Sequence, residues 1–169
     1  IKDRKYYQWL IQNQEEIKKL DLSLCQEMVH VSNLIKRDVV ERDPKENGER
    51  ALLNFGHTLG HAIEKLADFS LLHGHCVGLG CIGAMAISVN RGIIDRSELD
   101  RLKRFLESMG LPVTVTGLNA SEIIKTTKRD KKMDSGTIRF ILLKSIGEAV
   151  IDKTVTEEEM LCGLNEILV

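Results

Sequence analysis

The sequence predicts a mainly α-helical domain with one small β-hairpin. Most of the chain places apolar residues at steps of three or four, which is typical of amphipathic helices. Two β-rich stretches, TIRFILL (137–143) and EAVIDKTV (148–155), flank the turn-forming segment KSIG, and this predicts a hairpin near residues 137–153. The 169 residues suffice for one hydrophobic core, and neither a repeat nor a linker divides them. We therefore expect a single domain over residues 1–169.

The N-terminal third predicts two helices and a loop. Aromatic and aliphatic residues recur at helical spacing over residues 4–20. The sequence SLCQ that begins at Ser23 resembles a capping box, so a second helix is expected to open there. The polar, turn-rich stretch DPKENGE (43–49) predicts a loop after this helix.

The rest of the chain contains further helix signals. Apolar periodicity and the glycine, proline and capping residues that begin or end helices place these segments. They are a helix over about 50–67, another over about 74–91, a charged helix from Ser97 that Gly110 and Pro112 stop, a short helix capped by Asn119 and followed by the basic loop KRDKKMDSG (128–136), and a last helix opened by Thr156 with Glu159.

The composition excludes several classes of partner. Lys and Arg number 24 against 25 Asp and Glu, and no basic block stands out, so we expect no nucleic-acid partner. The longest uncharged apolar run, residues 76–89, is too short to cross a bilayer and predicts a buried helix. The four cysteines form no CxxC pair, which favours reduced residues in a cytoplasmic protein.

The segment LNFGHTLGHAIE (53–64) is the strongest candidate for a functional site. On a continuous helix over 50–66, a polar stripe would occupy an arc of roughly 80°. A solvated helix surface is one interpretation, but such surfaces usually pair Lys with Glu. Imidazole, amide and guanidinium groups instead suit metal coordination or anion binding. The stripe consists of Arg50, Asn54, His57, His61 and Glu64.

Glycines in this segment and in the next helix predict a close approach. Gly56 and Gly60 cost a helix on the order of 2 kcal/mol relative to alanine. A helix that tolerates both needs another backbone or a ligand close by. The following segment, LLHGHCVGLGCIGAMA (71–86), is rich in small residues that let helices pack closely.

Three interpretations of the histidines remain open from the residues alone. His57 and His61, four apart, could chelate one metal ion. Alternatively, His57 pairs with His73 across two helices and leaves His61 for acid–base or hydrogen-bonding work. In the third interpretation none of them binds metal. Catalytic zinc usually has three protein ligands and an open position, and the sequence supplies neither an HExxH motif nor an obvious third ligand.

The combined motifs resemble the C-terminal domain of the 3-dehydroquinate synthase family. The pattern R-x-x-x-N-F-G-H-T-x-G-H-A-I-E is followed by H-G-x-x-V, and NLIKRDVVERDP, ENGER and RDKKMDSGTIRFILLKSIGEAV accompany it in family order. Related sugar-phosphate cyclases share part of this pattern, and polyol dehydrogenases share less. The resemblance covers essentially the whole chain.

The resemblance implies an activity for the complete protein. Family members convert 3-deoxy-D-arabino-heptulosonate 7-phosphate into 3-dehydroquinate and phosphate in the shikimate pathway, with Zn²⁺ or Co²⁺ and NAD, and are commonly homodimers. Their N-terminal NAD-binding domain has no counterpart in these residues, which would form the helical metal- and substrate-binding domain. We expect this chain, which starts at Ile1 within a helical pattern, to be inactive alone.

The resemblance also assigns roles to individual residues. A glutamate upstream of Ile1 would be the third metal ligand. Two alternatives accompany this reading: a related cyclase or metal-dependent polyol dehydrogenase, and a non-catalytic helical interaction domain. The implied roles are metal binding for His57 and His73, catalysis for His61, Lys36 and Glu46, and substrate binding for Arg50, Asn54, and Lys131 or Lys132.

Overall fold

The fold is mainly helical with one two-stranded sheet, as the sequence predicts. The computed structural model describes residues 1–46, 48–68, 70–132 and 138–169, without the side chains of 130–132. In chain order the elements are α1 (Arg4–Gln12), α2 (Gln14–Lys18), α3 (Leu22–Arg42), the 3₁₀ helix η1 (Glu49–Asn54), α4 (His57–Leu66), α5 (His73–Asn90), α6 (Arg96–Ser108), α7 (Ala120–Lys132), β1 (Phe140–Ser145), β2 (Glu148–Asp152) and α8 (Glu157–Asn165).

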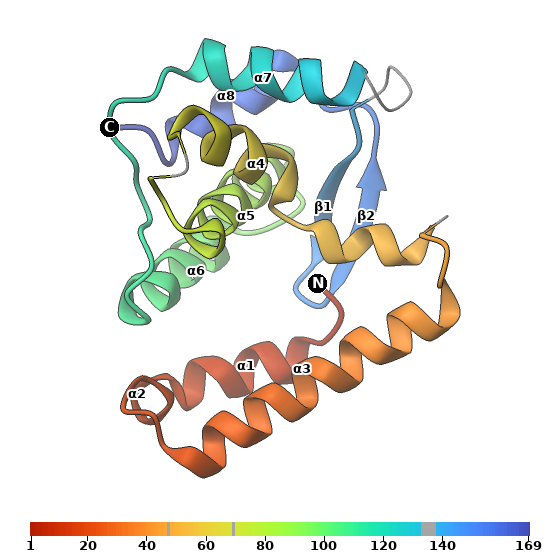
Figure 1. The fold of residues 1–169 in the computed structure, drawn as a ribbon, viewed down its shortest axis with the longest axis vertical. Helices are drawn as coiled ribbons and strands as arrows, with labels where there is room; N and C mark the ends of the chain where they lie inside the picture. Colours follow the sequence, from red (N-terminus) through yellow and green to blue (C-terminus); the bar gives the residue numbers. More distant parts are fainter. Residues whose placement is uncertain (47, 69, 133–137) are drawn as a thin grey trace.

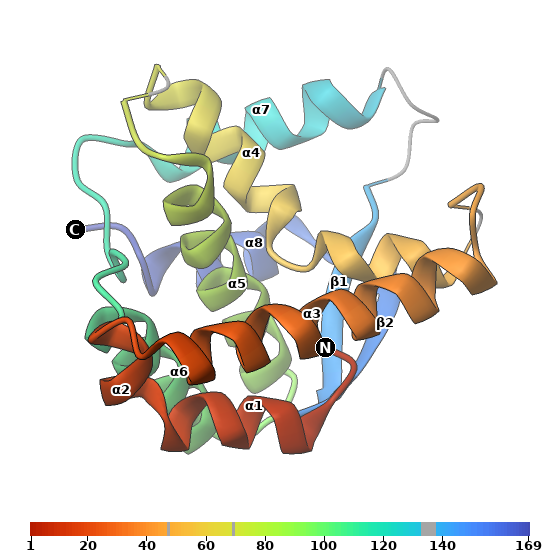
Figure 2. The ribbon, with the colours of Figure 1, turned by 60° about the horizontal axis from the view of Figure 1, so that its bottom comes forward.

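Helices α1 and α3 lie on one side of the molecule, and α4, α5, α7 and α8 lie on the other (Figures 1 and 2). The Oη of Tyr6 on α1 donates a hydrogen bond to the carbonyl of Met28 on α3 at 2.7 Å. The expected single helix over 4–20 is wrong in one respect, because it breaks at Asn13, whose Nδ2 donates back to the Trp9 carbonyl at 2.8 Å.

The start of α3 also differs from the prediction. Asp21, and not Ser23, caps the helix by accepting a hydrogen bond from the Leu24 N–H at 3.0 Å. Leu20 just before it has a left-handed backbone, with φ of 62°, which ends the preceding turn and orients Asp21 toward the first helical turn.

The predicted continuous helix over 50–67 is wrong. A 3₁₀ helix ends at Asn54, and α4 begins at His57 after a chain reversal at Gly56, whose φ is +81°. A Cβ on Gly56 would lie 2.7 Å from both the Cys81 nitrogen and the Val77 carbonyl oxygen. Glycine is required here by its left-handed backbone and by the adjacent helix, so the polar stripe extends over two elements instead of one.

Helices α4 and α5 pack through their backbones, which is what the glycines predict. A Cβ on Gly80 would lie only 1.9 Å from the Gly56 carbonyl oxygen, and one on Gly60 would lie 2.9 Å from the Cys76 carbonyl oxygen. At Gly60 and Gly80, the backbone of the facing helix therefore leaves no room for a side chain. Helix α5 is buried along most of its length, as expected for residues 76–89, and no helix in the described ranges combines the length and hydropathy of a membrane span.

The C-terminal third forms the predicted hairpin and last helix. Strands β1 and β2 pair antiparallel, with Phe140 opposite Asp152, and Phe140–Leu143 are buried against the helices. The Thr156 hydroxyl and the Glu159 carboxylate form the expected capping box of α8. The basic loop expected from Lys128 is wrong in its first half, since α7 continues through Lys132, and residues 133–137 lie outside the described part of the chain.

The hydrophobic core surrounds α5. Helices α4 and α8 pack along α5, and β1 covers it from another side (Figure 2). Fully buried side chains from each element meet there, so the start of α5 is held in place relative to α4. The largest of these are Leu59, Ile63, Leu79, Ile82, Met85, Ile87, Phe140, Leu142, Met160 and Leu164.

Candidate metal centre

Three imidazoles from two helices converge at one point of the surface. The ring centroids lie 5.2 Å apart for His57 and His61, 5.6 Å for His57 and His73, and 5.7 Å for His61 and His73. One ring nitrogen from each lies within 4.8 Å of the others. Ligand nitrogens around tetrahedral zinc are about 3.4 Å apart, given metal–nitrogen bonds near 2.05 Å, so small side-chain rotations would complete the approach.

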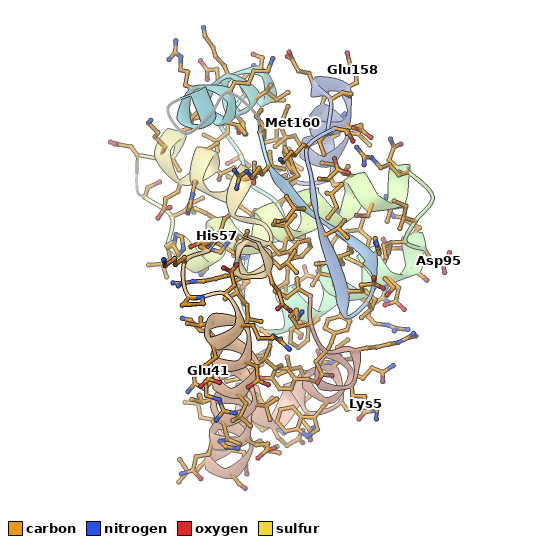
Figure 3. All side chains as sticks on the ribbon, turned by 90° about the vertical axis from the view of Figure 1, so that its right-hand side faces the viewer. Lys5, Glu41, His57, Asp95, Glu158 and Met160 are labelled. Carbon is orange, nitrogen blue, oxygen red and sulfur yellow. The ribbon has the colours of Figure 1, made fainter. Side chains whose placement is uncertain are left out.

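The fold explains why these rings meet. His57 is the first residue of α4 and His61 follows one turn later, so both project from the same face. His73 is the first residue of α5, and the α4–α5 backbone contact fixes its distance from α4. Figure 3 shows His57 on the same side of the molecule as Glu41 of α3, opposite Asp95 at the start of α6.

Two of the rings have an oxygen acceptor beside Nδ1. The Nδ1 of His57 lies 3.2 Å from the Phe55 carbonyl oxygen, and the Nδ1 of His73 lies 3.1 Å from Oε2 of Glu64. An acceptor beside Nδ1 favours a proton on that nitrogen, which leaves the Nε2 lone pair available for coordination. This arrangement is common around metal-binding histidines.

The predicted substrate-binding residues Arg50 and Asn54 meet the predicted catalytic residue Glu46. Asn54 Nδ2 donates to Glu46 Oε1 at 2.9 Å, and Arg50 Nε lies 3.8 Å from Glu46 Oε2. Arg50 also donates to the Pro44 carbonyl at 2.9 Å. Only Phe55 and Gly56 separate Asn54 from the first histidine, so these polar groups adjoin the imidazole cluster along the chain.

Glu46 has a backbone conformation that few side-chain-bearing residues adopt. Its φ is +56°, in the left-handed region. Such strain is maintained only where the surroundings impose it, and it recurs at functional sites. Here it accompanies a carboxylate that bonds to Asn54 and lies beside Arg50, which supports a functional role for this loop.

Of the predicted lysines, the structure describes the side chain of Lys36. Lys36 is exposed on α3, and within the described ranges it forms neither a hydrogen bond nor an ion pair. Lys131 and Lys132 end α7, but their side chains lie outside the described residues. The structure therefore unites six of the nine predicted residues in two adjoining groups: the imidazoles, and Glu46 with Arg50 and Asn54.

The sequence interpretation gave no role to two residues that organise the site. Glu64 lay on the predicted polar stripe, and its spacing from His57 and His61 placed it near them, but its contact with His73 required the tertiary structure. Asp43 Oδ2 accepts hydrogen bonds from the N–H groups of Gly48 and Arg50, at 2.8 and 3.0 Å. The Asp-Pro pair at the start of the loop was the available signal, since aspartate commonly stabilises turns in this way.

The donor set fits a transition metal such as zinc or cobalt. Neutral imidazole nitrogens are the common ligands of both ions, and three of them converge here with acceptors behind two of the rings. In the described ranges no other three histidine, cysteine or acidic side chains meet at such distances. The geometry makes both histidine pairings accessible, and the three sequence interpretations stay predictions.

Comparisons with known proteins agree with this geometry. Residues 1–133 match the family described as 3-dehydroquinate synthase C-terminal. The chain is 39% identical over 162 residues to a 3-dehydroquinate synthase of Acetivibrio thermocellus, covering 95% of this chain and 45% of that protein. It is 37% identical over 168 residues to that of Desulforamulus reducens, covering 98% and 47%. The chain thus spans about half the length of the curated relatives it matches.

Solved structures share the fold at lower sequence identity. The 2-epi-5-epi-valiolone synthase ValA of Streptomyces hygroscopicus subsp. jinggangensis, with NAD⁺ and Zn²⁺ bound, superposes with a TM-score of 0.87 at 21% identity, over 98% of this chain and 46% of its own. A 2-deoxy-scyllo-inosose synthase complex that contains NAD⁺ and Co²⁺ gives a TM-score of 0.74 at 19% identity, over 86% and 42%. These two structures support the fold alone, and the match over residues 1–133 shows that the chain belongs to the 3-dehydroquinate synthase C-terminal family.

Proposed function

We propose that this chain is the metal- and substrate-binding part of a 3-dehydroquinate synthase. The reaction would convert 3-deoxy-D-arabino-heptulosonate 7-phosphate into 3-dehydroquinate and inorganic phosphate. The observation that carries the proposal is the convergence of His57, His61 and His73 in a chain 39% identical to such an enzyme. Two related cyclases share the fold, but their identities of 21% and 19% support the architecture alone.

His57 and His73 would hold Zn²⁺ or Co²⁺, and His61 would serve the reacting hydroxyl. A bound metal ion acts as a Lewis acid toward the substrate's oxygen atoms. The N–H of His57 and His73 is directed to an acceptor, which keeps the opposite nitrogen of each ring available. The ring of His61 stands 5.2 Å from that of His57 and is exposed, so it can accept a proton from a hydroxyl beside the ion or return one.

Glu46, Arg50 and Asn54 would orient an anionic substrate. The guanidinium of Arg50 can bind a carboxylate or phosphate through parallel hydrogen bonds, and the amide of Asn54 adds a donor. Glu46 lies within reach of both side chains and so sets their directions. Lys36, and Lys131 or Lys132, would add ammonium groups for the phosphate once substrate and the remaining part of the enzyme are in place.

The remaining half of the enzyme would complete the site. The relatives are about twice as long as the matched region, and we propose that their other half supplies the NAD-binding domain and a carboxylate ligand for the metal. The cytoplasm and a homodimer are the setting we propose for the complete enzyme. This division of labour means that the chain alone binds metal but does not turn over substrate.

A metal titration tests the site independently of activity. We expect the chain to bind one Zn²⁺ or Co²⁺, and expect His57→Ala and His73→Ala each to lose binding. His30→Ala is the matched control, because His30 lies on α3 and does not belong to the imidazole cluster. Equal affinity in all three variants would contradict the metal site.

A reconstitution assay tests the reaction. The chain is mixed with the separately expressed N-terminal half of the Acetivibrio thermocellus relative, NAD⁺, zinc and substrate, and phosphate release is measured. We expect turnover only when both halves are present, and a loss of about 10²–10⁴-fold with His61→Ala. Turnover by the chain alone would overturn the proposed division, and a product other than 3-dehydroquinate would favour a related cyclase.

A further inference from the structure

Glu64 links the two helices that carry the histidines. It lies on α4, and its Oε2 is 3.1 Å from Nδ1 of His73, the first residue of α5. The Glu64 side chain is only 19% exposed, whereas the His73 side chain is 54% exposed. The contact therefore joins a sheltered carboxylate to a ring whose other edge remains open.

The backbone packing of α4 and α5 brings the two side chains within reach of each other. Gly56 and Gly60 pack against α5 so closely that an added Cβ at Gly60 would lie 2.9 Å from the Cys76 carbonyl oxygen. Glu64 follows one turn after Gly60, and His73 precedes Cys76 on the facing helix. Because the helices cannot shift without breaking this contact, the positions from which the Glu64 and His73 side chains project are fixed relative to each other.

The negative charge of Glu64 acts on the start of α5 beyond His73. Burial raises the pKa of the Cys76 thiol, and the Glu64 carboxylate raises it further. A thiol near this carboxylate is thus kept in its neutral form. The same carboxylate lies 3.1 Å from the Nδ1 of His73.

We propose that Glu64 is a positioning residue that holds His73 in the tautomer required for metal binding. The inference rests on the proposed metal site. Glu64 accepts the N–H of Nδ1, so the lone pair of Nε2 faces the ion, and the carboxylate makes the ring a stronger donor. Glu64 is not itself a ligand, because within the described residues the mutually close donor atoms belong to three histidines alone.

An ordinary surface ion pair would require a protonated His73 and would have no effect on its tautomer. The ion-pair role and the positioning role therefore predict different tautomers for the neutral His73 ring. A neutral histidine in water favours the proton on Nε2, whereas the Glu64 contact favours it on Nδ1. Nitrogen NMR distinguishes these tautomers without any metal or substrate.

The first arm of the test measures the tautomer of His73 in the metal-free chain at about pH 8, above the usual histidine pKa. We expect the Nδ1–H form in the wild type and a shift to the Nε2–H form in Glu64→Ala. Glu98→Ala is the matched control, since Glu98 is a helical carboxylate of similar exposure, 21%, that pairs with Arg101 on α6. The same tautomer in the wild type and in Glu64→Ala would overturn the proposal.

The second arm measures Zn²⁺ and Co²⁺ affinity by competition with a chelator, and records the visible spectrum of bound Co²⁺. We expect Glu64→Ala to weaken binding by about 10- to 100-fold, as for other residues that support a metal ligand. Glu64→Gln, which keeps an oxygen acceptor but loses the charge, should weaken it less. Unchanged affinity in Glu64→Ala would contradict the positioning role. A wild-type chain that binds neither ion would instead contradict the proposed function, and the tautomer would then decide the role of Glu64.

Discussion

The two ends of α5 both gather polar side chains from several elements, but they use them differently. At its C-terminal end, Arg91 donates to Glu159 at 2.6 and 2.9 Å and to Asp152 at 2.8 Å, which joins α5 to β2 and α8. At its N-terminal end, His73 meets two imidazoles of α4, and all three nitrogens lie within 4.8 Å of one another.

This difference separates a structural cluster from a candidate metal site. Around Arg91 opposite charges are paired at hydrogen-bonding distance, so the cluster contributes stability and leaves little for a ligand. Around His73 the convergent groups are all electron-pair donors. They do not attract one another, and they suit a cation placed between them. The rigidity of this end comes from backbone packing of glycines, and it does not depend on ion pairs.

The largest expected effect comes from disturbing that backbone packing. In Gly80→Ala the new Cβ would lie 1.9 Å from the Gly56 carbonyl oxygen, so α4 and α5 must separate. We expect a loss of more than about 3 kcal/mol in the free energy of unfolding by urea. Gly78→Ala is the control, since its Cβ would meet only Leu111 at an ordinary 3.5 Å. Equal stability of the two variants would mean that the helices do not pack as closely as described.

Zinc should stabilise the N-terminal end of α5 and act independently of the other end. At a free zinc concentration about 100 times the dissociation constant, binding to the folded state adds about 2.7 kcal/mol to the unfolding free energy. We expect thermal unfolding to shift equally in the wild type and in Arg91→Ala, and not to shift in His57→Ala. A zinc response lost in Arg91→Ala would show that the two ends are coupled.

Removing Arg91 should destabilise the C-terminal end by about 1–3 kcal/mol, because two neighbouring carboxylates lose a charged donor. The side chain is 23% exposed, and those of Asp152 and Glu159 are 18% and 19% exposed, so solvent compensates only in part. Urea unfolding of Arg91→Ala measures this cost. The matched variant is Arg101→Ala. The Arg101 side chain is 46% exposed, so its ion pair with Glu98 should contribute less than about 1 kcal/mol to the free energy of unfolding.

The same variant has a defined pH dependence. Hydrogen bonds from Arg91 lower the pKa of Glu159 below its ordinary value of 4.5, against an opposing effect of burial. A lowered folded-state pKa contributes stability above the unfolded value, and that stability is lost as the pH falls through the folded value. The difference between wild type and Arg91→Ala should therefore be constant near neutral pH and shrink below about pH 4.5. A difference that grows on acidification would contradict this assignment.

The smallest expected effect concerns the cap beside the Arg91 cluster. Thr156 caps α8 through the Glu159 N–H at 3.3 Å, while the Glu159 carboxylate accepts from the Thr156 N–H at 2.9 Å. Thr156→Ala removes one of these bonds and should cost about 1 kcal/mol. Thr156→Ser should retain most of this stability in the same unfolding measurement, because serine keeps the hydroxyl. An equal loss of stability in both variants would contradict a role for the hydroxyl as the cap.

Local sequence patterns by themselves determined the elements whose signals act within a few residues. The capping residues of α8, the uncharged apolar run of α5 and the β-rich stretches around KSIG predicted these elements, because capping and local composition are short-range signals. The combined motifs around the paired histidines also predicted the family, which the match over residues 1–133 confirms.

Only the tertiary structure decided how those residues are arranged. Gly56 is a poor helix former, but the position of the break and the close approach of α5 to that backbone became visible only in the tertiary structure. The contact of Glu64 with His73 likewise joins two helices whose separation is set by glycines elsewhere in the chain. Local propensity acts through bonded neighbours, whereas the direction of a side chain toward a residue on another helix depends on packing of the whole core.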